Sequence, residues 1–152
     1  MLRILLTLCV TLALGAVPMT VVADIGHRAL VQNNGTLLIN GKTVRLFGIY
    51  IPTIGHTCRI NFVPTKCAPR AVLQLDFKVQ GFVYCEEMLR HIDHSVSSVC
   101  RTGRNREDLG AWMLRQGWAV ALPSAPIEYV ALERFARANG RGFWGFQVDE
   151  MR

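Results

Sequence analysis

The sequence predicts an α+β fold in which a small Greek-key barrel of five strands is capped by about three helices. Strand-like runs separated by Asn-Gly turns fill residues 27–50, which is the pattern of a β-meander. Further along, apolar residues repeat at helical spacing in three segments that alternate with strand-like runs. The resulting order, β-β-β-loop-α-β-β-α-β-α, fits an OB-type barrel, and the pattern alone also allows another α+β fold.

The first three strands are predicted from alternating residues and turn signals. Alternation begins at Leu30–Gln32, and an Asn-Asn-Gly turn at residues 33–35 ends that strand. An Asn-Gly-Lys turn at residues 40–42 separates a second strand, Thr36–Ile39, from a third, Thr43–Tyr50. These three strands form the first half of the expected barrel.

A loop and a helix are expected next. Residues 51–67 contain two prolines and a glycine without a clear period, so they predict an irregular loop, which Cys58 and Cys67 bracket. A helix is predicted over Pro69–Phe77, because proline suits the first turn of a helix and apolar residues then recur at helical spacing.

A hairpin and a second helix follow. Strands over Phe82–Cys85 and Val96–Arg101 are joined by a hairpin whose tip is predicted at residues 91–94. The second helix begins after Asn105–Asp108, which offers a cap and acidic residues for the first turn, and it ends at Gly117.

The last helix is predicted between Pro126 and Gly140, after a short extended piece at residues 118–121. Its apolar stripe consists of Tyr129, Leu132 and Ala136, with Phe135 beside it. The tryptophans are assigned to the core rather than to stacking surfaces: Trp112, Trp118 and Trp144.

The N-terminus is typical of a secretory signal peptide. Arg3 precedes an uncharged apolar run, Ile4–Ala23, that ends in small residues suited to cleavage after Ala23. We therefore expect a signal peptide at residues 1–23 and one exported domain at residues 24–152. The alternative is an uncleaved anchor, because about 20 apolar residues can span a bilayer. No later run is long enough to cross a membrane.

The cysteines predict disulfide bonds. Export to an oxidising compartment would leave an even set of four, for which three pairings exist. There is no CxxC pair, and the histidines lack zinc-site spacing, so no metal site is predicted. The four cysteines are Cys58, Cys67, Cys85 and Cys100.

The charge balance is moderately basic. Removal of residues 1–23 takes away one arginine and no acidic residue, so the formal charge falls from +6 to +5. Such a domain suits a polyanionic partner, either nucleic acid or an acidic polysaccharide, and the same charge also serves solubility alone.

Six segments, in order along nearly the whole mature chain, resemble motifs of the thermonuclease-like (staphylococcal-nuclease-like) family, in its exported bacterial branch with four cysteines. Residues 44–53, VRLFGIYIPT, resemble V-R-L-x-G-I-D-A-P-E, and residues 108–119, DLGAWMLRQGWA, resemble D-L-x-x-x-L-V-x-x-G-W-A. The remaining segments are Val31–Leu37, Gly55–Cys67, Val83–Glu86 and Tyr129–Trp144.

The resemblance implies a five-stranded OB barrel capped by helices and a calcium-dependent phosphodiesterase that acts on DNA and RNA. Calcium requires oxygen ligands, chiefly carboxylates. A carboxylate positions the attacking water, and two arginines stabilise the charge that develops on the phosphate. The branch also implies a periplasmic or extracellular protein of a bacterium.

This chain departs from the family at the positions that carry catalysis. Only Arg45 is retained. An alternative alignment assigns the second arginine to Arg104, but the equal cysteine spacing favours Ser95. The substituted positions are Asn33 and Gly35 in the metal-binding turn, Tyr50 for the second metal-binding Asp, Thr53 for the Glu and Ser95 for the second arginine. We therefore expect no bound calcium and no intact catalytic set.

Two clusters remain as candidate sites. His91, Asp93 and His94 at the hairpin tip could bind a metal or act as a base, although an exposed polar turn has the same composition. The residues expected to bind a polyanion are Arg45, Tyr50, Arg101, Arg104 and Arg106.

The sequence thus favours an inactive, exported binding module for nucleic acid or an acidic polysaccharide, such as an exopolysaccharide. The alternatives are an active secreted nuclease with a rebuilt site and a purely structural envelope protein. Cys85 and Cys100 are equidistant from the predicted hairpin tip, so we expect them to pair across the two strands. Cys58 would then pair with Cys67.

Overall fold

A computed structural model describes residues 25–52, 57–60, 63–66, 68–145 and 147–148 of the chain. The predicted signal peptide lies outside the described residues. Within those ranges, no helix combines the length and the apolar character that crossing a membrane requires.

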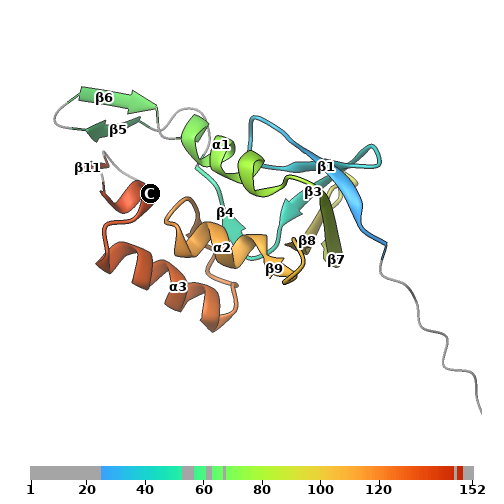
Figure 1. The fold of residues 1–152 in the computed structure, drawn as a ribbon. Coiled ribbons are helices and arrows are strands. Elements are labelled where there is room, and N and C mark those ends of the chain that lie inside the picture. The colour runs from blue at the N-terminus through green and yellow to red at the C-terminus, as the bar shows by residue number, and fades with distance from the viewer. Residues whose placement is uncertain (1–24, 53–56, 61–62, 67, 146, 149–152) are drawn as a thin grey trace, which may run out of the picture.

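Five strands close into a barrel (Figure 1). Neighbours around the barrel run β1–β2–β3–β8–β7 and back to β1. The β3–β8 pair is parallel and the other four pairs are antiparallel, so the predicted Greek-key barrel of OB type is confirmed. The strands are β1 His27–Val31, β2 Leu37–Ile39, β3 Lys42–Leu46, β7 Phe82–Arg90 and β8 Val96–Thr102.

Three α-helices accompany the barrel, as predicted (Figure 1). They are α1 Ala68–Lys78, α2 Leu109–Arg115 and α3 Ile127–Ala138. The side chain of Asp108 caps α2 by accepting a hydrogen bond from the backbone N of Ala111. Besides the hairpin β5–β6 described below, the short elements are β4 Ile49–Tyr50, β9 Glu107–Asp108, β10 Val120–Ala121, the 3₁₀ helix η1 Gly142–Gly145 and β11 Gln147–Val148.

The third predicted strand, residues 43–50, is interrupted in the structure. The chain turns at Gly48, whose φ is +72°, and the following strand β4 leaves the barrel to pair with β10. Glycine suits this turn because a side chain is strained at positive φ, and an added Cβ would lie 3.3 Å from the Tyr129 ring.

The irregular loop predicted over residues 51–67 was wrong in part. A hairpin occupies much of it, formed by β5 Thr57–Ile60 and β6 Val63–Lys66. Because β5 also pairs with β11, β6 is an edge strand. Pro64 is tolerated there, since an edge position needs no second row of hydrogen bonds. Proline alone was therefore a poor indicator of a loop.

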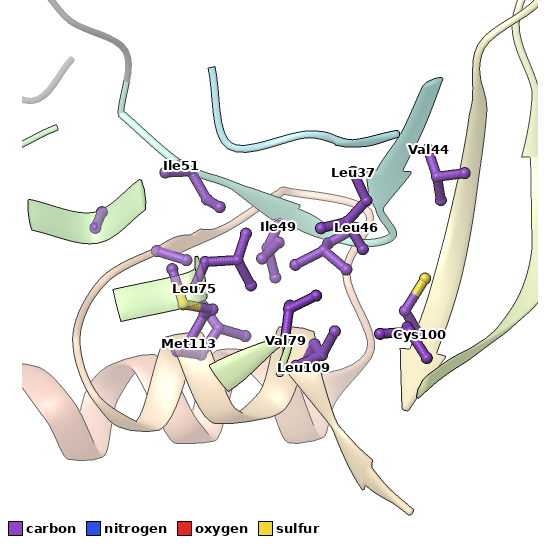
Figure 2. Packing of buried hydrophobic residues seen from close by; sticks show 14 of the residues in the cluster. Leu37, Val44, Leu46, Ile49, Ile51, Leu75, Val79, Cys100, Leu109 and Met113 are labelled. Atoms are coloured by element: carbon purple, nitrogen blue, oxygen red, sulfur yellow. The ribbon is translucent and has the colours of Figure 1, made fainter. Parts of the chain in front are cut away.

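The core lies between the barrel and the helices. Figure 2 shows Leu37, Leu46 and Ile49 from the strands pointing toward residues of the helical side. Alternation on β8 buries every second residue against this core, as expected for a strand with one inward face. The helical-side residues are Leu75 of α1, Val79 just after it, and Leu109 and Met113 of α2.

The predicted disulfide between Cys85 and Cys100 is confirmed. The two residues are register partners on β7 and β8, and their sulfur atoms are 2.04 Å apart. Cys58 lies on β5, whereas Cys67 lies outside the described residues. The second pairing therefore stays a prediction.

The last helix begins after Pro126 and buries Tyr129 and Ala136, as its apolar stripe predicted. Phe135, expected beside that stripe, is instead 44% exposed. Glu133 takes an interior position and is only 8% exposed. The three tryptophans are half-buried. Trp112 and Trp118 pack against the core, whereas the ring of Trp144 lies under the guanidinium of Arg137.

Candidate functional site

A pocket of about 180 Å³ lies between the β1–β2 turn and strands β3 and β4. It brings together Gly35, Arg45 and Tyr50, three of the positions singled out in the sequence, from a turn and two consecutive strands. The described residues that line it include one cation and no carboxylate: Asn34, Gly35, Thr36, Arg45, Leu46, Ile49, Tyr50 and Ile51.

The β1–β2 turn forms one wall of the pocket and is held by its own side chains. The amide oxygen of Asn34 accepts a hydrogen bond from the backbone N of Thr36 at 3.1 Å. The Thr36 hydroxyl lies 2.7 Å from that same oxygen and 2.6 Å from Oε1 of Gln32. These contacts use the polar side chains of the turn to stabilise the turn itself.

Gly35 leaves no room for a side chain. Its φ is +76°, a conformation in which side chains are strained, and an added Cβ would lie 2.9 Å from Cδ1 of Ile51. An aspartate therefore cannot occupy this position unless Ile51 moves. The lining offers calcium only neutral oxygens, so it does not fit that ion. Nor do the described residues contain three or more His, Cys, Asp or Glu grouped to hold a metal.

Arg45 reaches out of β3 between two buried residues and contacts the β7–β8 hairpin. Its NH2 group donates to Oδ2 of Asp93 at 2.9 Å, and its Nε donates to Oγ of Ser95 at 3.2 Å. The Arg45 and Asp93 side chains are 50% and 57% exposed, so the ion pair faces solvent. The strand register alone did not reveal this partner, which lies 48 residues further along the chain.

Asp93 is itself held by Ser95. Its Oδ1 accepts hydrogen bonds from the backbone N of Ser95 at 3.1 Å and from the Ser95 hydroxyl at 2.6 Å. These bonds, followed by the charge of Arg45, hold the pKa of Asp93 below its ordinary value. Ser95, which the resemblance aligns with the second arginine, is only 4% exposed, and its hydroxyl also accepts the hydrogen bond from Nε of Arg45.

The two histidines of the hairpin tip do not form a catalytic cluster with Asp93. Nε2 of His91 lies 2.7 Å from the hydroxyl of Ser97 on β8. His94 has a φ of +61° and is exposed at the turn. The arrangement is that of a tight hairpin turn, from which Asp93 and Ser95 both accept hydrogen bonds from Arg45 of the pocket.

Tyr50 provides an aromatic surface at the pocket. It is 41% exposed on β4, where it pairs with Val120 of β10. The buried Glu133 of α3 fixes β10, because its Oε2 accepts a hydrogen bond from the backbone N of Ala121 at 2.7 Å and its Oε1 accepts one from Arg137 at 2.8 Å. The amphipathic pattern of α3 did not predict this supporting role for an acidic residue.

The basic turn, defined by Arg101 at the end of β8 and by Arg104 and Arg106 after it, does not line the pocket. Arg45 is in register with Ser97, whereas Arg101 lies four residues further along β8, roughly 13 Å away. Arg101 lies 3.5 Å from Oε2 of Glu86, and the Arg106 guanidinium lies 3.5 Å from the centre of the Tyr84 ring.

The sequence-predicted binding set therefore divides into two groups. Arg45 and Tyr50 belong to the pocket, and Arg101 and Arg106 belong to the turn, as does the exposed Arg104. Thr53, which the resemblance aligns with the catalytic Glu, lies outside the described residues.

Comparison with protein-family models and with curated proteins finds no match for this chain. The thermonuclease-like resemblance therefore stays a prediction that depends on the ordered motifs of the sequence.

Proposed function

We propose that the mature chain is an exported, catalytically inactive thermonuclease-like domain whose pocket binds a polyanion. One observation carries the proposal: Arg45 and Tyr50 share a pocket, and the described residues that line it include no carboxylate. A guanidinium suits the oxygens of a phosphate, and an exposed aromatic ring suits the flat face of a base or a sugar. The pocket is thus equipped to bind an anionic polymer but not to activate water.

The absence of a carboxylate argues against hydrolysis at this pocket. Phosphodiester cleavage needs a nucleophile, which a metal ion or a general base generates. Arg45 can do neither, because a guanidinium stays protonated in proteins. The contact between Gly35 and Ile51 opposes a return of the metal-binding aspartate at the turn.

Export is supported by the disulfide between Cys85 and Cys100 together with the signal-like N-terminus. Structural disulfides persist in oxidising compartments and are rare in the cytosol. The periplasm or the exterior of a bacterial cell is therefore the proposed location.

Single-stranded nucleic acid is the favoured ligand, because it offers phosphates and exposed bases in alternation. Stacking of a base on an aromatic side chain contributes about 1–3 kcal/mol and tolerates any sequence. An acidic polysaccharide offers anionic groups and sugar faces, and it is the second ligand to test.

The test is a binding titration of the mature domain with single-stranded DNA and with a polyuronic acid, each at low and high salt. We expect DNA to bind more tightly and its affinity to fall steeply with salt, because phosphate contacts release counterions. Arg45→Gln should reduce both the affinity and its salt dependence. Tyr50→Ala should weaken DNA binding, whereas Tyr50→Phe retains the ring and should not.

Two outcomes would contradict the proposal. One is that the affinity for DNA is unchanged in both Arg45→Gln and Tyr50→Ala, which would show that DNA binds elsewhere than in the pocket. The other is no measurable binding of either polymer at low salt. Preferential binding of the polyuronic acid would keep the polyanion site but replace nucleic acid as its ligand.

A further inference from the structure

We propose that Asp93 is an internal competitor for the guanidinium of Arg45, which weakens every anion at the pocket so that only a ligand with a further contact there binds measurably. This inference rests on the proposed function, since it concerns which anions reach Arg45. Asp93 would then set the affinity threshold of the pocket without being a binding residue for the ligand.

Asp93 occupies one of the positions from which an anionic group of the ligand could bind Arg45. Its Oδ2 accepts a hydrogen bond from NH2 of Arg45, while Nε of Arg45 donates to Ser95. Two donors of the guanidinium are therefore engaged within the protein. A phosphate that binds Arg45 through the same donors must displace the carboxylate.

The hairpin holds the carboxylate in place before any ligand arrives. Asp93 Oδ1 is bound by the backbone N and the hydroxyl of Ser95, and Ser95 is buried. The tip is closed by hydrogen bonds from His94 N to His91 O at 3.1 Å and from His91 N to Ser95 O at 2.9 Å. A carboxylate fixed in this way competes at a high effective concentration.

A free anion and a polymer meet this competitor differently. Inorganic phosphate has only Arg45 to bind, so it gains no second contact that offsets the competition by Asp93. A single-stranded polymer that stacks on Tyr50 brings its neighbouring phosphate to Arg45 as part of the same molecule, which raises the effective concentration of that phosphate. The ion pair can open, because both side chains are about half exposed and exposed ion pairs are weak.

Asp93→Asn is the informative substitution. Asparagine keeps an oxygen that can accept the hydrogen bonds from Ser95, and it removes the charge that faces Arg45. Glu87→Gln is the matched control. It removes one negative charge from the same hairpin, where Glu87 pairs with Arg90 at 2.8 Å rather than with Arg45.

The experiment titrates wild type, both variants, Arg45→Gln and the Arg45→Gln/Asp93→Asn double variant with a single-stranded DNA oligomer and with inorganic phosphate. We expect Asp93→Asn to bind DNA about fivefold more tightly, the scale of an exposed ion pair. It should also bind phosphate at concentrations that leave the wild type unbound. Glu87→Gln should match the wild type, and the double variant should show no gain over Arg45→Gln.

The results separate this inference from the proposed function. If Arg45→Gln and Tyr50→Ala weaken DNA binding but Asp93→Asn does not strengthen it, the competitor role is overturned and the binding site remains. An equal gain in Glu87→Gln also overturns it, because the gain is then a general charge effect. If neither the wild type nor Asp93→Asn binds DNA, both proposals fail.

Discussion

At the scale of single residues, the pocket depends on a glycine, Gly35, in the turn that forms one of its walls. Gly35 combines a positive φ with close packing against Ile51. Gly41 has nearly the same φ, +77°, but an added Cβ there would meet nothing within 4 Å. Substitutions at the two glycines therefore distinguish the cost of backbone strain, which both positions share, from the cost of packing against Ile51, which applies to Gly35 alone.

We expect Gly35→Ala to destabilise the domain more than Gly41→Ala. A left-handed conformation costs a side chain about 1–2 kcal/mol, which both variants incur. Gly35→Ala adds overpacking against Ile51, which typically costs about 1–3 kcal/mol more. Urea denaturation measures the difference in the free energy of unfolding. Equal losses in the two variants would show that Ile51 yields freely and that the turn could admit a side chain.

A second prediction at this scale is that the mature domain shows no calcium-dependent cleavage of single-stranded DNA. Loss of one oxyanion donor alone costs about 2.7–4 kcal/mol of transition-state stabilisation, and loss of the metal costs several more. Even when discounted for non-additivity, the combined loss is about six orders of magnitude in rate. The assay uses calcium and magnesium, with Arg45→Ala as the control. Metal-dependent cleavage that disappears in Arg45→Ala would revive the active nuclease with a rebuilt site.

At the scale of elements, Glu107 joins two helices to the end of the barrel. From β9 it accepts a hydrogen bond from Lys78 of α1 at 2.6 Å and contacts Arg115 of α2. These two cations, with the Lys78 hydrogen bond as the largest cause, hold the pKa of Glu107 below its ordinary value of 4.5. Relative to its protonated form, the ionised carboxylate of Glu107 is therefore more stable in the folded chain than in the unfolded chain.

The lowered pKa predicts a pH-dependent contribution to stability. A carboxyl group whose folded pKa is depressed stabilises the fold above its unfolded pKa and loses that contribution as pH falls through the folded value. Glu107→Gln should therefore have a lower free energy of unfolding than the wild type near neutral pH. This gap in stability should begin to narrow near about pH 4.5 and should close as pH falls through the lower pKa of the folded chain. Thermal unfolding across this range measures the gap, with Glu128→Gln, an exposed acid of α3, as the control. A gap that persists in acid would assign the loss to packing rather than to charge.

At the scale of the whole molecule, local patterns predicted the strands and helices, and the structure decided that five of the strands close into a barrel. Alternation, Asn-Gly turns and helical spacing act between near neighbours, so they indicate which face of each element is buried. The Cys85–Cys100 pair followed for the same reason, because a hairpin fixes which residues lie opposite each other. Local patterns failed at β5 and β6, where Pro64 suggested a loop but the edge of a small sheet accommodates it.

The sequence by itself predicted the strands and the three helices, and its resemblance to the thermonuclease-like family predicted a barrel without metal-binding carboxylates. Only the tertiary structure decided that five strands close into a barrel, that Arg45 and Tyr50 share a pocket apart from Arg101 and Arg106, that Ile51 crowds a side chain placed at Gly35 and that Asp93 engages Arg45. The physical reason is the range of the interactions. Periodicity records which side of a strand faces the core, but contacts between elements depend on how barrel closure brings distant strands and turns together.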